Sequence, residues 1–161
     1  MSGREWTLTV HAPAPWITAN WITKANRFAR SAAVKKWREA AYAAAVAAKL
    51  PTGLTVVTID AQCWFPAVGD LPVDDRENLR PTVKAATDGL GRETRRTVKG
   101  RLHIAKGYGL IPDDDDKHLA RSQHLTIVRD ATVPHGSYGR LELIIRELDR
   151  LRLVPEIGGA R

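Results

Sequence analysis

The segment from residue 54 to residue 65 limits the possible folds most, because apolar and polar residues alternate along it. This period of two is typical of a β-strand with one buried face. The apolar positions are Val57, Ile59, Ala61, Cys63 and Phe65, and the polar ones are Thr58, Asp60 and Gln62. We therefore expect this segment to be a central strand of a sheet.

Two helices are predicted beside this strand. The first runs from about Arg27 to Lys49, and Pro51 and Gly53 stop it. Its apolar face is made by residues at helical spacing, namely Val34, Trp37, Ala41, Ala45 and Ala48. The second helix is predicted near residues 78–90, with Asn78 as a plausible N-cap.

The second predicted helix has two different faces. Its apolar face is made by Leu79, Val83, Ala86 and Leu90. Arg80, Lys84 and Asp88 follow one another at intervals of four on another face. We expect this charged row to be free for solvent or a ligand.

Three further strands are predicted, at residues 5–11, 119–128 and 138–148, and the last two are expected to form an antiparallel pair. Together these elements predict an α+β fold, a single domain with a mixed β-sheet and two principal helices. The domain spans residues 1–150, and residues 151–161 are expected to be a flexible basic tail.

Length and cysteine content narrow the class of protein. A chain of 161 residues can bury a core without a disulfide or a metal. Cys63 is the single cysteine, no apolar run approaches the roughly 18 residues of a membrane span, and residues 1–5 lack the apolar core of a secretory signal. These features predict a cytoplasmic protein with no membrane partner.

The charges are segregated along the chain. The formal net charge is +7, but eight of the 18 acidic residues lie in two short windows, residues 70–77 and 113–116. Outside these windows the chain has 24 basic and 10 acidic residues. A strongly basic protein with two acidic segments suggests a polyanionic partner, but the charge does not identify it.

The two acidic segments suggest a metal site. Carboxylates crowded this closely repel one another unless a cation neutralises them. Mg²⁺ prefers such oxygen ligands, and on a basic protein it points to phosphodiester cleavage. The alternative is that both segments are solvated acidic loops that only keep the chain soluble.

Residues 91–106 are the most basic segment, with six basic residues and one acidic residue. We expect an exposed loop or hairpin arm. Arg30 is either at the rim of the core or a phosphate contact. The candidate DNA-binding residues are Arg27, Arg30, Arg80, Arg95, Arg96, Lys99 and Arg101.

The order of motifs resembles the RusA-like Holliday-junction resolvases, endodeoxyribonucleases common in bacteriophages and prophages. The family has an Asp-x-Asp-Asn motif, then a Lys followed by Asp-Ala-Leu on the same helix, then a Gly followed by an Asp-Asp pair. The matching stretches here are residues 75–78 (DREN), 84–90 (KAATDGL) and 109–114 (GLIPDD). The resemblance covers roughly residues 5–148.

The resemblance implies a catalytic site. Asp75, Glu77 and Asp114 would bind Mg²⁺, with Mn²⁺ as a possible substitute, and Asp113 would lie beside them. Lys84 would be the essential lysine near the scissile phosphate. The resemblance also implies a homodimer that acts on branched DNA, in the host cytoplasm if the protein is phage-encoded.

Three features depart from the family pattern. Glu77 replaces the second aspartate, the gap from Asn78 to Lys84 is longer and contains Pro81, and residues 91–106 are an insertion. The insertion suggests an added DNA-contacting arm.

Other polar and aromatic residues are assigned lesser roles. Asp88 is expected to orient Lys84 through an i, i+4 pair, and Asp70 and Asp74 to be loop charges. His118 and His124 are expected to be surface or structural residues. Trp37 and Trp64 are expected in the core, and Trp16 and Trp21 could stack on unpaired bases.

The function predicted from the sequence is a Mg²⁺-dependent, structure-selective DNA endonuclease that resolves Holliday junctions by symmetric cleavage. The first alternative is a non-catalytic DNA-binding protein in which the carboxylates serve only as acidic loops. The second is a nuclease with the same site that cleaves flaps or replication forks.

Overall fold

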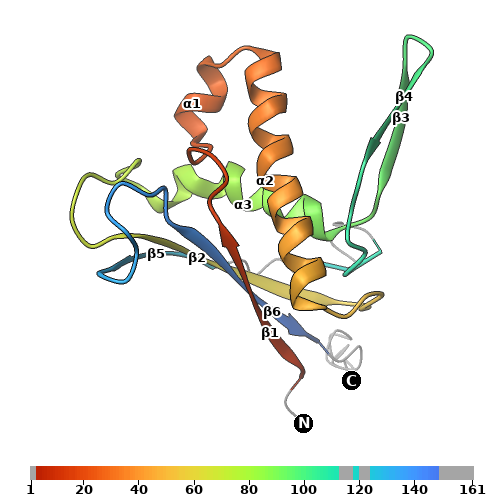
Figure 1. Ribbon diagram of the computed structural model, residues 1–161. Helices are drawn as coiled ribbons and strands as arrows, with labels where there is room; N and C mark the ends of the chain where they lie inside the picture. Colours follow the sequence, from red (N-terminus) through yellow and green to blue (C-terminus); the bar gives the residue numbers. More distant parts are fainter. Residues whose placement is uncertain (1–2, 113–117, 120–123, 149–161) are drawn as a thin grey trace, which may run out of the picture.

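The computed structural model of the chain describes residues 3–112, 118–119 and 124–148. Helices lie on one face of a four-stranded sheet, and a separate two-stranded hairpin projects from the same side (Figure 1). The predicted α+β fold is confirmed, with a mixed sheet and two principal helices in one domain. The predicted tail, residues 151–161, lies outside the described residues.

The sheet contains β1 (Glu5–His11), β6 (Arg140–Glu147), β2 (Val57–Pro66) and β5 (Leu125–Asp130), in that order. β6 is antiparallel to both β1 and β2, whereas β5 is parallel to β2. β2 therefore has a neighbour on each side, which confirms the predicted central strand. All five apolar positions of β2 are buried, and its polar positions are half-buried.

The predicted antiparallel pair of the last two strands is wrong. β5 and β6 do not pair with each other, because β2 lies between them. The connecting segment passes the end of β2 at Gly139, where a Cβ would collide with the backbone carbonyl of Trp64. Glycine at this position lets the chain pass close to β2 and enter the sheet on its other side.

The long helix α2 (Arg27–Ala48) agrees with its predicted bounds. It follows the short helix α1 (Ala19–Lys24), and Asn26 caps it by accepting a hydrogen bond from the backbone N–H of Ala29. Trp37, Ala41 and Ala45 are buried, but Val34 is half-buried and Ala48 is exposed. The apolar face of α2 is therefore shorter at both ends than the sequence predicts.

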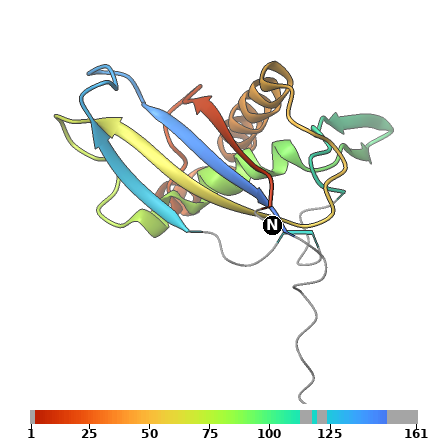
Figure 2. The same cartoon turned by 90° about the horizontal axis from the view of Figure 1, so that it is seen from below.

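The second principal helix, α3 (Arg80–Leu90), is preceded by a 3₁₀ turn, η1 (Arg76–Leu79). The predicted N-cap role of Asn78 is wrong, because Leu79 occupies that position and makes no side-chain capping bond. Pro81 in the first turn has no N–H to satisfy, which reduces the need for a cap. The four predicted apolar positions of α3 are buried, and α3 crosses α2 on the helical side of the sheet (Figures 1 and 2).

Aromatic rings join the helices to the sheet. The ring of Trp16 lies 4.9 Å, between centroids, from both Trp37 and Phe65. Trp37 is buried as predicted, but the prediction that Trp16 stacks on DNA bases is wrong, because only 7% of it is exposed. Trp16 lies between α2 and β2, where its ring packs against one aromatic ring from each element.

Trp64 does not lie in the core that was predicted for it. It is half-buried on the sheet face opposite the apolar side of β2, and the guanidinium of Arg140 lies 4.4 Å from its ring centroid. Trp21 is 39% exposed. No helix within the described ranges is both long and apolar enough to cross a membrane.

Candidate functional site

A cavity of about 670 Å³ lies among α1, α2, η1 and α3. Its apolar lining includes Ala19, Ile22, Val34, Pro81, Val83 and Leu119. Four charged residues also line it, and all come from η1 and α3: Glu77, Arg80, Lys84 and Asp88. Charged groups thus meet an apolar floor in one concave site, the arrangement common in binding sites.

The charged side of the cavity is the row predicted on α3. The other sides of α3 pack against α2 and the core. The accessible side of α3 is therefore the row of Arg80, Lys84 and Asp88. Lys84 Nζ lies 3.2 Å from Asp88 Oδ1, which confirms the predicted ion pair. The Lys84 side chain is 72% exposed and that of Asp88 is 24% exposed, so Asp88 contacts the exposed lysine from a more buried position.

Glu77 is held by its neighbours in the 3₁₀ turn. Its carboxylate accepts hydrogen bonds from Nε and one Nη of Arg80, a two-point contact that fixes its orientation. Its backbone N–H donates to Asp75 Oδ1 at 3.0 Å. The Asp75 bond uses one carboxylate oxygen, and the second oxygen can serve as a metal ligand.

The metal site predicted by the resemblance is divided between described and undescribed residues. Asp113 and Asp114 lie outside the described ranges, and within those ranges no three His, Cys, Asp or Glu residues form a metal-binding group. Glu77 and Asp88 both line the cavity, where Glu77 is paired with Arg80 and Asp88 with Lys84. Asp75 and Glu77 lie together at the start of η1, and this pair of carboxylates fits Mg²⁺, which commonly takes one or two carboxylates and completes its shell with water and phosphate oxygens. The convergence of Asp75, Glu77 and Asp114 stays a prediction.

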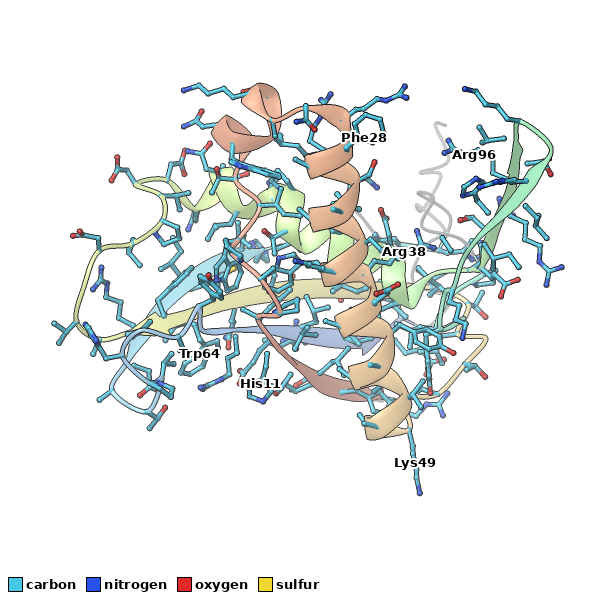
Figure 3. The ribbon with its side chains drawn as sticks, turned by 45° about the horizontal axis from the view of Figure 1, so that its top comes forward. His11, Phe28, Arg38, Lys49, Trp64 and Arg96 are labelled. Carbon is cyan, nitrogen blue, oxygen red and sulfur yellow. The ribbon has the colours of Figure 1, made fainter. Side chains whose placement is uncertain are left out.

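The predicted DNA-binding residues lie on three elements. Arg27 and Arg30 are exposed in the first turns of α2, Arg80 lines the cavity, and the others are exposed on the hairpin. The sequence analysis missed Phe28, which is 73% exposed at the N-terminal end of α2 (Figure 3). The guanidinium carbon of Arg27 lies 4.9 Å from the centroid of the Phe28 ring. A large exposed aromatic residue beside an arginine can stack on a nucleic-acid base.

The basic segment forms the predicted hairpin arm, with strands β3 (Thr94–Val98) and β4 (Arg101–Ala105). Its base is attached to α2 by Arg38, which the sequence analysis also missed. The Arg38 guanidinium donates to the backbone carbonyls of Arg92, Ala105 and Lys106 at 3.2–3.4 Å (Figure 3). Its partners are backbone atoms far along the chain, so the local sequence pattern gives no signal for this role.

The other titratable candidates have structural contacts. His118 Nδ1 lies 2.8 Å from the carbonyl oxygen of Thr55, and the backbone N–H of His124 donates to Asp60 Oδ1 at 2.9 Å. Both support the connection between β2 and the segment before β5, as expected for structural residues. Burial in β2 raises the pKa of the Cys63 thiol to about 12, which keeps it protonated and unreactive.

No protein-family model matches this chain, and a search of curated proteins finds none with significant similarity.

Proposed function

We propose that this protein is a Mg²⁺-dependent, structure-selective endodeoxyribonuclease that resolves four-way DNA junctions. The observation that carries the proposal is the cavity in which Glu77, Arg80, Lys84 and Asp88 meet. Three of these four lie in the two stretches, residues 75–78 and 84–90, that resemble RusA-like resolvase motifs. The exposed basic residues of α2 and the hairpin support DNA as the partner.

The residues proposed to take part in the reaction have separate roles. Asp75, Glu77, Asp113 and Asp114 are the carboxylates proposed to hold Mg²⁺, or Mn²⁺ in its place. When bound, the metal would activate water and stabilise the leaving oxygen. Lys84 places its ammonium group where a phosphate can approach and offsets the negative charge that develops during cleavage. Asp88 positions Lys84, and Arg80 positions Glu77.

Symmetric cleavage of a four-way junction requires two equivalent sites. A homodimer with a two-fold axis supplies them, since each subunit then cuts one of two symmetry-related strands. We therefore propose a homodimer as the active form. A cytoplasmic location, in the host if the protein is phage-encoded, belongs to the same proposal.

The test is Asp75→Asn, assayed for cleavage of a synthetic four-way junction in Mg²⁺ and, separately, for junction binding. Asparagine keeps the oxygen that caps η1, so the fold is expected to persist. Cleavage should fall by about 10²-fold or more while binding is retained, because one metal ligand loses its charge. Asp74→Asn is the matched control, since Asp74 is an exposed loop carboxylate next in the chain.

The outcomes separate the competing functions. Unchanged cleavage by Asp75→Asn would reject the site. Junction binding by the wild-type protein with no cleavage under any divalent metal would favour the non-catalytic DNA-binding alternative. Faster cleavage of flaps or replication forks than of junctions would keep the same residues and change the substrate.

A further inference from the structure

The β3–β4 hairpin has two chemically different faces. Residues paired across antiparallel strands share a face, and successive residues alternate between faces. Arg96 pairs with His103 and Val98 with Arg101, which places both arginines and the histidine on one face. Arg95 pairs with Ile104 and Thr97 with Leu102, which gives the opposite face two large apolar side chains.

The arginines of the two faces also differ in their partners. Arg95 Nε donates to Glu93 Oε1 at 2.7 Å, so its charge is already offset locally. No described residue forms an ion pair with Arg96 or Arg101, and both are exposed. We call the surface of Arg96, Arg101 and His103 the cationic face. Its two arginine charges have no carboxylate partner among the described residues, whereas that of Arg95 is partly offset by Glu93.

The position of the hairpin directs the cationic face toward the body of the molecule. The hairpin stands beside α2, and its tip reaches the level of the N-terminal end of that helix (Figures 1 and 2). Arg96 lies on the side of the hairpin that faces this end of α2, where Phe28 is exposed (Figure 3). Arg27 and Arg30 are exposed in the first turns of α2, at the same end of the helix as Phe28.

Two features hold the hairpin in this position. At its base, the three hydrogen bonds from Arg38 attach both ends of the hairpin to α2. At its tip, Lys99 and Gly100 both have positive φ, 49° and 75°, as the two central residues of a type I′ turn do. The turn matches the twist of the strands, so the faces keep their orientation without a core beneath them.

We propose that the cationic face of the hairpin binds the phosphate backbone of a DNA duplex, which lies between the hairpin and the N-terminal half of α2. The opposite face, with Arg95, does not contact this DNA. The inference rests on the proposed nuclease function and narrows it, since it assigns Arg96 and Arg101, but not Arg95, to the substrate. A phosphodiester backbone is the occupant that fits, because the cationic face and the first turns of α2, with Arg27 and Arg30, are both basic and exposed.

The experiment compares Arg96→Ala/Arg101→Ala with Arg95→Ala in the full-length protein. Equilibrium binding to a four-way junction is measured between 50 and 200 mM salt without divalent metal, so that no cleavage occurs. Each lost phosphate contact reduces the log–log salt slope by about 0.9. The double variant should lose about two units of slope, and Arg95→Ala should keep the wild-type slope. Because all three side chains are exposed, thermal unfolding should be unchanged in each variant.

Each result supports or overturns the inference. A loss of about one unit of slope in Arg95→Ala would show that the opposite face also contacts DNA, and an unchanged slope in the double variant would show that the cationic face does not. Either outcome rejects the proposed assignment. The junction-cleavage assay of the wild-type protein in Mg²⁺ reports separately on the proposed function. If the wild-type protein cleaves junctions but the variants keep its salt slope, the proposed function stands and the assignment of the cationic face is rejected.

Discussion

Strand β2 and the β3–β4 hairpin are both β-structure, yet they differ in what holds them. β2 has a pairing partner on each side and buries every second residue against the helices. In the hairpin each strand has one partner, and all residues but Ala105 are exposed. The stability of the fold therefore resides in the sheet and its helices, and the exposed hairpin residues can bind a ligand. Substitutions in the two regions should therefore affect different measurements.

The largest loss of stability is expected from Trp37→Ala, in the layer that covers β2. Trp37 is fully buried, contacts Trp16, and donates from Nε1 to the carbonyl oxygen of Pro15 at 3.2 Å. Removing the ring leaves a cavity and an unpaired carbonyl, which costs about 3–5 kcal/mol. Urea unfolding followed by circular dichroism measures this change. A loss below 1 kcal/mol would show that the core does not depend on this contact.

The next largest loss of stability is expected from Gly89→Ala, at the crossing of α3 and α2. A Cβ at residue 89 would collide with the backbone carbonyl oxygen of Arg38, so the helices must separate. Overpacking of this kind costs about 1–3 kcal/mol. Gly91→Ala is the control, since its Cβ would lie 3.6 Å from the nearest atom and its φ is negative. Equal unfolding free energies for the two variants would contradict the close helix crossing.

Cys63 gives a pH-dependent test of the burial of β2. Burial raises the pKa of its thiol from 9.0 to about 12. Between these values the unfolded chain releases the proton and the folded chain keeps it, so this group's contribution to stability is lost as pH rises from about 9 to about 12. In Cys63→Ala the free energy of unfolding should therefore fall less steeply with pH over this range than in the wild type. An equal fall in the wild type and the variant would show that Cys63 does not contribute to it.

The smallest effect is expected from Leu102→Ala in the hairpin. Leu102 is 58% exposed, so truncation removes little buried area and should change the unfolding free energy by less than about 0.5 kcal/mol. Urea unfolding of this variant, compared with Trp37→Ala, measures the contrast between the two regions directly. A loss of 2 kcal/mol would mean that the hairpin is packed against another surface in solution.

Local periodicity predicted the elements but not their long-range contacts. The alternation in β2, the helical spacing in α2 and α3, and the basic hairpin were all predicted correctly, because each depends on neighbours within a few residues. The pairing of β5 and the burial of Trp16 depend on segments far along the chain. For the same reason the sequence predicted the Lys84–Asp88 pair, which is one helical turn long, but not the role of Arg38.

The measurement that tests the proposed nuclease site most directly is single-turnover cleavage of a four-way junction in Mg²⁺ by Lys84→Ala and Lys35→Ala. Both lysines are exposed helix residues with an i+4 carboxylate partner, but only Lys84 lines the cavity. Because the role proposed for Lys84 is to offset charge in the transition state, its loss should slow cleavage by about 10²-fold or more, and Lys35→Ala should cleave as the wild type does. Equal cleavage rates for the two variants would contradict the assignment of the cavity as the active site.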